Sequence, residues 1–150
     1  MSKLQLLIPE ARPFFEAFLT ALDKQGLRYS IVETLRTIEV QEAYYAQGRK
    51  PLEEINELRK KAGLYLLGEA EGKKIITNTM ESAHLIGKAA DIVPVVDNKI
   101  PWTITGENAG LWLTFGQLGK EARLEWGGDW KPFSKFGIGW DAPHYQKINT

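Results

Sequence analysis

Apolar residues recur three and four positions apart in four stretches of the chain, a spacing that places them on one face of a helix. These stretches predict helices over residues 9–26, 39–48, 52–63 and 105–123. Pro13 suits the first turn of the first helix, and Gly26 is placed to end it. In the last helix Thr105 is expected to cap the N-terminus, whereas Gly116 and Gly119 weaken the helix by about 1 kcal/mol each relative to alanine. Two such glycines indicate that this helix packs closely against another element.

Four shorter stretches carry apolar, β-branched and aromatic residues in the patterns of strands. They predict strands over residues 29–35, 89–96, 124–126 and 144–147. Residues 97–99 are Asp-Asn-Lys, a turn signal that predicts a hairpin after the second strand. Residues 64–81 lack a clear period, and we expect a long loop there with a short strand at 74–77. This order of elements implies an α+β fold, a single domain over residues 1–150 with a small antiparallel sheet flanked by helices.

Composition excludes several classes of function. Hydrophobic residues make up 43% of the chain and charged residues 25%, which is typical of a globular protein and argues against disorder. The 19 basic residues balance 19 acidic ones, so no basic excess exists to drive binding to nucleic acid. Cysteine is absent, which removes disulfides and thiolate metal ligands and suits a reducing cytosol.

The N-terminal sequence bears on where the protein acts. The apolar run at residues 4–8 is too short for a signal peptide, and no stretch approaches the roughly 20 apolar residues of a membrane helix. We therefore expect a protein that is made in the cytoplasm and has no membrane anchor. To act outside the cytoplasm, it would need a separate partner to release it.

The chain has only two histidines, and each has an aspartate close by in the sequence. His84 precedes Asp91, and His144 follows Asp141. Taken alone, a histidine is more often structural or exposed, and Asp141 before Ala-Pro is equally a turn-forming residue. The apolar strand beyond Asp91 makes a carboxylate there unfavourable unless a cation compensates it. Two imidazoles and one carboxylate also form the ligand set of a catalytic zinc site, with water in the fourth position.

These residues carry a resemblance to a known family. Ser82, His84 and Asp91, followed by Asp141 and His144, resemble the motif of the D-alanyl-D-alanine carboxypeptidase-like zinc peptidases, the fold group of lysostaphin and hedgehog. Further matching segments are Leu35-Arg36-Thr37 with Gln41 and Gly48-Arg49, residues 125–130, and residues 143–146. Within this group, the closer match is to the L-alanyl-D-glutamate endopeptidases of the phage endolysin type.

The resemblance implies one zinc ion (Zn2+) per chain, bound by His84, Asp91 and His144. It implies that Asp141 is the general base that takes a proton from the metal-bound water, whose pKa zinc lowers to about 7. A base three residues before a ligand is held at a set distance from that water.

The remaining site residues implied by the resemblance act on the substrate. Arg36 would polarise the scissile carbonyl and stabilise the developing oxyanion, although it would also serve as a surface arginine at a strand end. Ser82 and Gln41 would contact substrate or support the metal ligands, or be ordinary loop and helix residues. Residues 51–73 look like an insertion relative to shorter members, and an insertion there bears on the shape of the substrate groove.

Glu125 and three tryptophans can each be interpreted in two ways. Glu125 is a rival general base, or it holds the second nitrogen of a ligand histidine. Trp126, Trp130 and Trp140 line a groove for a glycan-peptide substrate, or they are core residues, which is the commoner place for tryptophan.

The function implied by the resemblance is a zinc metallopeptidase, a hydrolase that cuts the peptide stem of bacterial peptidoglycan between L-alanine and D-glutamate. Such a protein would be a monomeric, bacteriolytic phage endolysin that degrades the cell wall and needs a holin-type partner for release. Asp141 favours this subgroup, because the dipeptidases of vancomycin resistance carry glutamate at that place.

Two other functions are open. One is a D-alanyl-D-alanine dipeptidase or carboxypeptidase, and the other is a non-catalytic peptidoglycan-binding module of the same fold. The presence of Asp141 and Arg36 argues against the non-catalytic module.

Overall fold

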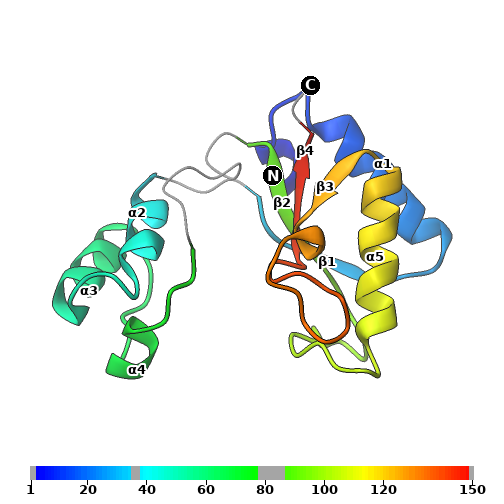
Figure 1. The fold of residues 1–150 in the computed structure, drawn as a ribbon. Helices are drawn as coiled ribbons and strands as arrows, with labels where there is room; N and C mark the ends of the chain where they lie inside the picture. The colour runs from blue at the N-terminus through cyan, green and yellow to red at the C-terminus, as the bar shows by residue number, and fades with distance from the viewer. Residues whose placement is uncertain (1–2, 35–37, 78–86, 149–150) are drawn as a thin grey trace. The chain divides into compact units, whose positions relative to one another are not determined.

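The computed structural model describes residues 3–34, 38–77 and 87–148. The chain forms two compact units, one made of residues 1–35 and 87–150 and the other of residues 36–86 (Figure 1). The expectation of one domain over the whole chain stays a prediction. No helix in the described residues is long and apolar enough to cross a membrane.

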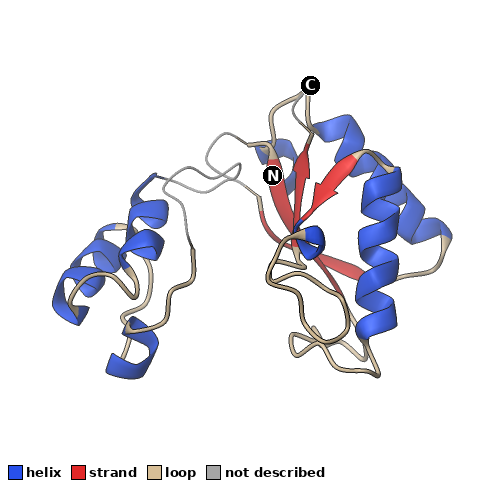
Figure 2. Ribbon diagram, in the orientation of Figure 1, coloured by secondary structure: helices blue, strands red, loops and turns tan. Residues whose placement is uncertain are grey.

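The first unit is built on a four-stranded antiparallel sheet (Figure 2). Its strands are β1 (Tyr29–Glu33), β2 (Ala89–Pro94), β3 (Leu124–Trp126) and β4 (His144–Lys147). Their order in the sheet is β1-β2-β4-β3, so β2 and β4 are central. All four strands lie at the predicted places, and the antiparallel α+β fold is confirmed.

Two helices, α1 (Arg12–Lys24) and α5 (Ala109–Glu121), pack together, and α5 also packs on β2 and β3 (Figure 1). Successive side chains of a strand point to opposite faces, so Trp126 on β3 and Tyr145 on β4 join the core while their neighbours in sequence do not. The Tyr145 ring lies 4.6 Å from that of Phe18 on α1, and burial raises the pKa of its hydroxyl well above the ordinary value. The other face, called the polar face below, carries Glu125 on β3 and His144 and Gln146 on β4.

The glycines of α5 confirm the close packing that the sequence indicates. A Cβ atom added at Gly116 would lie 2.5 Å from the ring of Trp126, and one added at Gly119 would lie 2.5 Å from the ring of Tyr145. Glycine is required at both positions because the aromatic rings occupy the space of a side chain. Close contact with β3 and β4 therefore outweighs the lower helix propensity of glycine.

The second unit contains α2 (Ile38–Ala46), α3 (Leu52–Lys61) and the short helix α4 (Glu69–Gly72). Its small apolar core includes Ile55, which is fully buried, together with Ala46 and Leu67. Two side chains of α3 hold the segment that follows it. Asn56 exchanges hydrogen bonds with the backbone of Leu67 through Nδ2 and Oδ1, at 3.1 and 2.8 Å.

Arg59 is the second of these side chains and is 3% exposed. Its Nε atom donates to the carbonyl of Tyr65 at 2.6 Å, and its Nη1 atom donates to the side-chain oxygen of Gln47 at 3.4 Å. Gln47 in turn donates from Nε2 to the carbonyl of Glu71 at 2.9 Å. The guanidinium thus links α3, the residues after α2 and the loop before α4, which gives residues 51–73 an ordered structure of their own.

Most helix and turn predictions agree with the structure. The predicted turn at 97–99 is confirmed: Asp97 and Asn98 both have positive φ, 52° and 62°, and Val96 and Lys99 exchange backbone hydrogen bonds of 2.8 and 2.9 Å. Positive φ at both central positions is the geometry of a two-residue hairpin turn. Gly26, with φ of 69°, follows the end of α1 as predicted.

Two predictions were wrong. Residues 74–77 form no strand, and the helix α4 lies just before them. The last long helix begins at Ala109, not at Thr105. The Asn108 side chain accepts a hydrogen bond from the backbone N–H of Thr105 at 2.8 Å and donates to the carbonyl of Thr103 at 2.9 Å. These bonds close a turn before the helix, and such local side-chain bonds compete with helix formation.

Candidate active site

Two of the predicted metal ligands lie directly opposite each other on the two central strands. Asp91 on β2 pairs with His144 on β4. Because residues opposite each other in an antiparallel pair project from the same face, their side chains meet on the polar face of the sheet. Asp141 joins them through the turn before β4, where its carbonyl accepts a hydrogen bond from the backbone N–H of His144 at 3.0 Å.

The three side chains converge on one nitrogen atom. His144 Nδ1 lies 3.7 Å from Asp91 Oδ1 and 3.8 Å from Asp141 Oδ2. The exposed fractions of these side chains are 7% for His144, 20% for Asp91 and 28% for Asp141. Both separations are too long for hydrogen bonds. The distance of 3.7 Å between Asp91 and His144 lets this pair bind one cation together. The partial exposure leaves a route for water.

Gln146 contacts the other nitrogen of the His144 ring. Its Oε1 atom lies 2.7 Å from His144 Nε2. An amide oxygen only accepts hydrogen bonds, so this contact favours the neutral tautomer with hydrogen on Nε2 and the lone pair on Nδ1. The Nδ1 lone pair then lies near the Asp91 carboxylate, and this pair of donors favours a cation. The donor set therefore fits a metal ion such as zinc, which binds imidazole and carboxylate ligands.

A complete metal site is not visible within the described ranges, where no group of three histidine, aspartate or glutamate side chains is arranged to hold an ion. The third predicted ligand, His84, lies outside the described residues, as do Ser82 and Arg36. Gln41 is described, on α2, where it is fully buried. The ligand set and the substrate contacts therefore stay predictions.

A glycine-rich turn brings Asp141 to the site. β3 leads into the short 3-10 helix η3 (Gly127–Asp129), and a Cβ atom added at Gly127 would collide with the backbone carbonyl of Asp141. The N–H of Gly139 donates to the carbonyl of Gly128 at 2.6 Å, which closes the loop back on η3. Glycine at these places lets the two backbone segments approach each other and sets the position of the turn that holds Asp141.

The three tryptophans have different places. Trp126 is 3% exposed, and its Nε1 atom donates to the carbonyl of Ala142 at 2.7 Å, so it is a core residue. The Trp130 ring lies 5.0 Å from the ring of His144 and 6.2 Å from that of Trp140, which is 47% exposed. The groove interpretation is therefore wrong for Trp126, while Trp130 and Trp140 flank the site.

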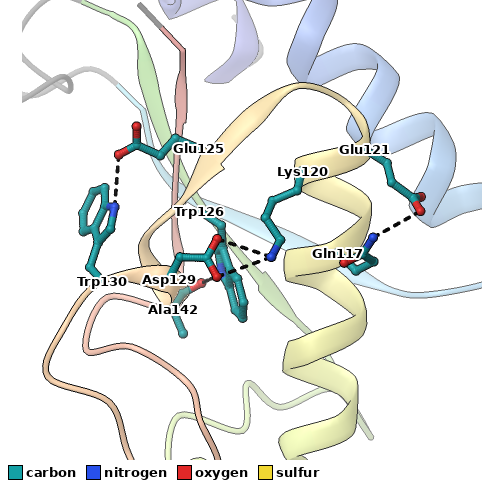
Figure 3. A network of polar contacts seen from close by, with 8 residues as sticks. All are labelled: Gln117, Lys120, Glu121, Glu125, Trp126, Asp129, Trp130 and Ala142. Carbon is teal, nitrogen blue, oxygen red and sulfur yellow. Dashed lines mark hydrogen bonds and ion pairs between the residues drawn. The ribbon is translucent and has the colours of Figure 1, made fainter.

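Glu125 lies on the polar face and does not hold the second nitrogen of His144, while a contact with His84 lies outside the described residues. Its Oε2 atom accepts a hydrogen bond of 3.0 Å from Nε1 of Trp130 (Figure 3). The second nitrogen of His144 is contacted by Gln146, a residue that the sequence interpretation did not single out. The signal for it is the strand period: a residue two positions after a ligand projects from the same face.

Residues 76–147, which contain all three predicted ligands, match a family described as D-alanyl-D-alanine carboxypeptidase. Over 147 residues the chain is 28% identical to the peptidoglycan L-alanyl-D-glutamate endopeptidase CwlK of Bacillus subtilis (strain 168). This match covers 95% of the chain and 74% of CwlK.

Solved structures share the fold. The L-Ala D-Glu endopeptidase ChiX of Serratia marcescens aligns with a TM-score of 0.58 and 20% identity, over 97% of this chain and 84% of ChiX. A vancomycin resistance D,D-pentapeptidase, VanY, in complex with Zn(II), aligns with a TM-score of 0.53 and 15% identity, over 95% of this chain and 73% of VanY. Residues 76–147 are therefore similar in sequence to the D-alanyl-D-alanine carboxypeptidase family, and the chain shares its fold with ChiX and VanY.

Proposed function

We propose that this chain is a zinc metallopeptidase that hydrolyses the peptide stem of peptidoglycan between L-alanine and D-glutamate. The observation that carries the proposal is the convergence of Asp91 and Asp141 on the Nδ1 atom of His144, at 3.7 and 3.8 Å, on the polar face of the sheet. The choice of bond is supported by CwlK and ChiX, both of which are named as L-alanyl-D-glutamate endopeptidases.

Asp91, His144 and the predicted third ligand, His84, would hold the zinc ion. The choice of zinc is supported by the complex of VanY with Zn(II). When bound, zinc would supply a water ligand with a pKa of about 7 and a Lewis acid for the scissile carbonyl.

Asp141 would be the general base. Its side chain is 28% exposed, so its carboxylate is accessible to water, while its backbone is bonded to that of His144. Oδ2 would accept a proton from the attacking water and return it to the amino group of D-glutamate as the C–N bond breaks. Arg36 would stabilise the oxyanion and Ser82 would contact substrate. Gln41, which is fully buried, would support the residues of the site rather than contact substrate.

The test is digestion of purified peptidoglycan sacculi followed by mass spectrometry of the products. We expect new amino termini on D-glutamate, with L-alanine left on the sugar acid, and no such products from the Asp141→Asn variant. Cleavage at any other bond of the stem would overturn the assignment of the bond.

A second candidate, a D-alanyl-D-alanine carboxypeptidase, is favoured by the family description and by the likeness to VanY. The same digestion separates the two, because a carboxypeptidase releases terminal D-alanine and leaves the bond between L-alanine and D-glutamate intact. Failure to hydrolyse any bond, with zinc bound, would instead indicate a non-catalytic binding module.

We further propose that the protein acts as a monomeric endolysin that is made in the cytoplasm and released by a holin-type partner. The proposal is supported by the resemblance of the sequence motifs to those of phage endolysins. Expression in bacteria, with and without a membrane-perforating protein, tests it. Lysis that needs the perforating protein supports the proposal, and lysis without it contradicts it.

A further inference from the structure

We propose that Gln146 is a positioning residue that holds His144 in the tautomer with its lone pair on Nδ1, where the metal is bound. Trp130, anchored by Glu125, limits the orientation of the same ring. The inference rests on the proposed function because it takes His144 as a metal ligand. The residues concerned are not ligands themselves. Gln146 lies on β4, Glu125 lies on β3, and Trp130 follows η3.

The strand pairing places Gln146 beside the His144 ring. It lies two residues after His144 on β4, so both side chains project from the polar face. Ala89 on β2 and Glu125 on β3 are its opposite neighbours. The small side chain of Ala89 leaves room on one side, and the contact of 2.7 Å with His144 Nε2 follows. Because β4 is central and paired on both sides, the backbone under this contact is held in place.

Electrostatics explain why the ring needs such a contact. Asp91 and Asp141 present carboxylate oxygens to Nδ1 at 3.7 and 3.8 Å, and in the metal-free protein these negative charges attract a hydrogen on that nitrogen. The tautomer with hydrogen on Nδ1 keeps its lone pair on Nε2, which points away from the carboxylates. The acceptor oxygen of Gln146 opposes this by favouring hydrogen on Nε2. Ligand histidines commonly need such a second partner for full metal affinity.

Trp130 restricts the ring from another side. Its ring centroid lies 5.0 Å from that of His144 at an interplanar angle of 45°, and its indole N–H is bonded to Glu125 at 3.0 Å (Figure 3). Glu125 is the residue opposite Gln146 in the β3–β4 pair. The β3–β4 register thus places Gln146 opposite Glu125, and Glu125 holds Trp130. Gln146 selects the tautomer of His144, and Trp130 limits rotation of its ring.

The experiment compares Gln146→Met, which removes the acceptor at similar length, with Gln146→Glu, which keeps one. Gln117→Met is the matched control, an exposed glutamine on α5. The ring tautomer is read by nitrogen-15 NMR of the metal-free proteins at a pH where the imidazole is neutral. Zinc affinity is read by competition with a chelator. The chain has only two histidines, so a His84→Gln variant assigns the signals.

We expect hydrogen on Nε2 in the wild type, in Gln146→Glu and in the control. In Gln146→Met we expect hydrogen on Nδ1 and zinc affinity roughly 10- to 100-fold lower. Unchanged tautomer and affinity in Gln146→Met would overturn the inference. Should that variant not fold, Gln146→Asn, which is too short to reach the ring, is expected to show the same change. A wild type that binds no zinc would refute the proposed function, while the NMR comparison still decides the role of Gln146.

Discussion

At the scale of single residues, the two aspartates near His144 have different surroundings and therefore different expected roles. Asp91 lies within β2 and is 20% exposed, whereas Asp141 lies in a turn and is 28% exposed. A ligand benefits from a rigid strand, and a base must meet a water molecule. We therefore expect Asp91 to bind the metal and Asp141 to transfer the proton.

Replacing Asp141 by asparagine tests this difference. The amide keeps the size of the side chain but cannot take a proton, so we expect zinc content to stay at one ion per chain and turnover to fall about 100-fold or more. Metal analysis and hydrolysis of sacculi measure the two quantities. Asp129→Asn, at an exposed position of η3, is the control and should be as active as wild type.

The outcome also decides between the two candidate bases. If Asp141→Asn is fully active while Glu125→Gln binds zinc and is inactive, Glu125 is the base. The structure argues against that result, because the Glu125 carboxylate is already bonded to the indole of Trp130.

At the scale of elements, the contact between α5 and the sheet depends on the absence of side chains at two positions. Gly119→Ala would place a methyl group 2.5 Å from the ring of Tyr145, a core residue next to His144 in sequence. We expect the free energy of unfolding to fall by about 1–3 kcal/mol, because overpacking outweighs a helix-propensity gain of about 1 kcal/mol. Chemical denaturation measures it.

The same helix offers a matched control. A Cβ atom added at Gly110, in the first turn of α5, meets no described atom within 4 Å. Gly110→Ala should therefore leave stability unchanged or raise it by up to about 1 kcal/mol. If both variants are equally stable, the packing explanation of Gly119 is wrong.

In the second unit, Arg59 links the elements through hydrogen bonds to Tyr65 and Gln47. Arg59→Met keeps much of the apolar length but removes these donors, so we expect local stability to fall by about 2 kcal/mol. Amide hydrogen exchange should speed up in α2 and α3 and stay unchanged in β2 and β4. Lys60→Met, at an exposed neighbour, should change neither. Uniform acceleration across both units would contradict a local role.

At the scale of the whole molecule, metal binding and folding should be coupled. Asp91 and His144 lie far apart in sequence, and an ion bound to both is lost on unfolding. With free zinc at 100 times its dissociation constant, we expect about 2.7 kcal/mol of added stability. Calorimetry should show a lower melting temperature after chelation, restored by zinc but not by magnesium. An unchanged melting temperature on chelation, in protein shown to contain zinc, would exclude this coupling.

Local features of the sequence determined the elements of this protein. The signals used were the period of hydrophobic residues, Gly26 and the Asp97–Asn98 turn. Each acts over a few residues, so it could be interpreted without knowledge of the fold. The four strands and the main helices lie where these signals indicate. The motif around Asp91, Asp141 and His144 likewise predicted residues that the sheet brings together. The helix start predicted at Thr105 was wrong because the N–H of Thr105 donates to the side chain of Asn108, which closes a turn before the helix.

The tertiary structure alone decided which neighbours these residues meet. Trp126 and Trp130 are alike as residues, yet one enters the core and the other lies against His144, because the chain turns at η3 between them. Gln146 rather than Glu125 reaches the second histidine nitrogen because spacing along β4 and the register with β3 set the distances. The contact of Trp130 with His144 and the pairing of Gln146 with Glu125 join residues far apart in the chain. They depend on how strands pair and loops close, which a local pattern does not encode.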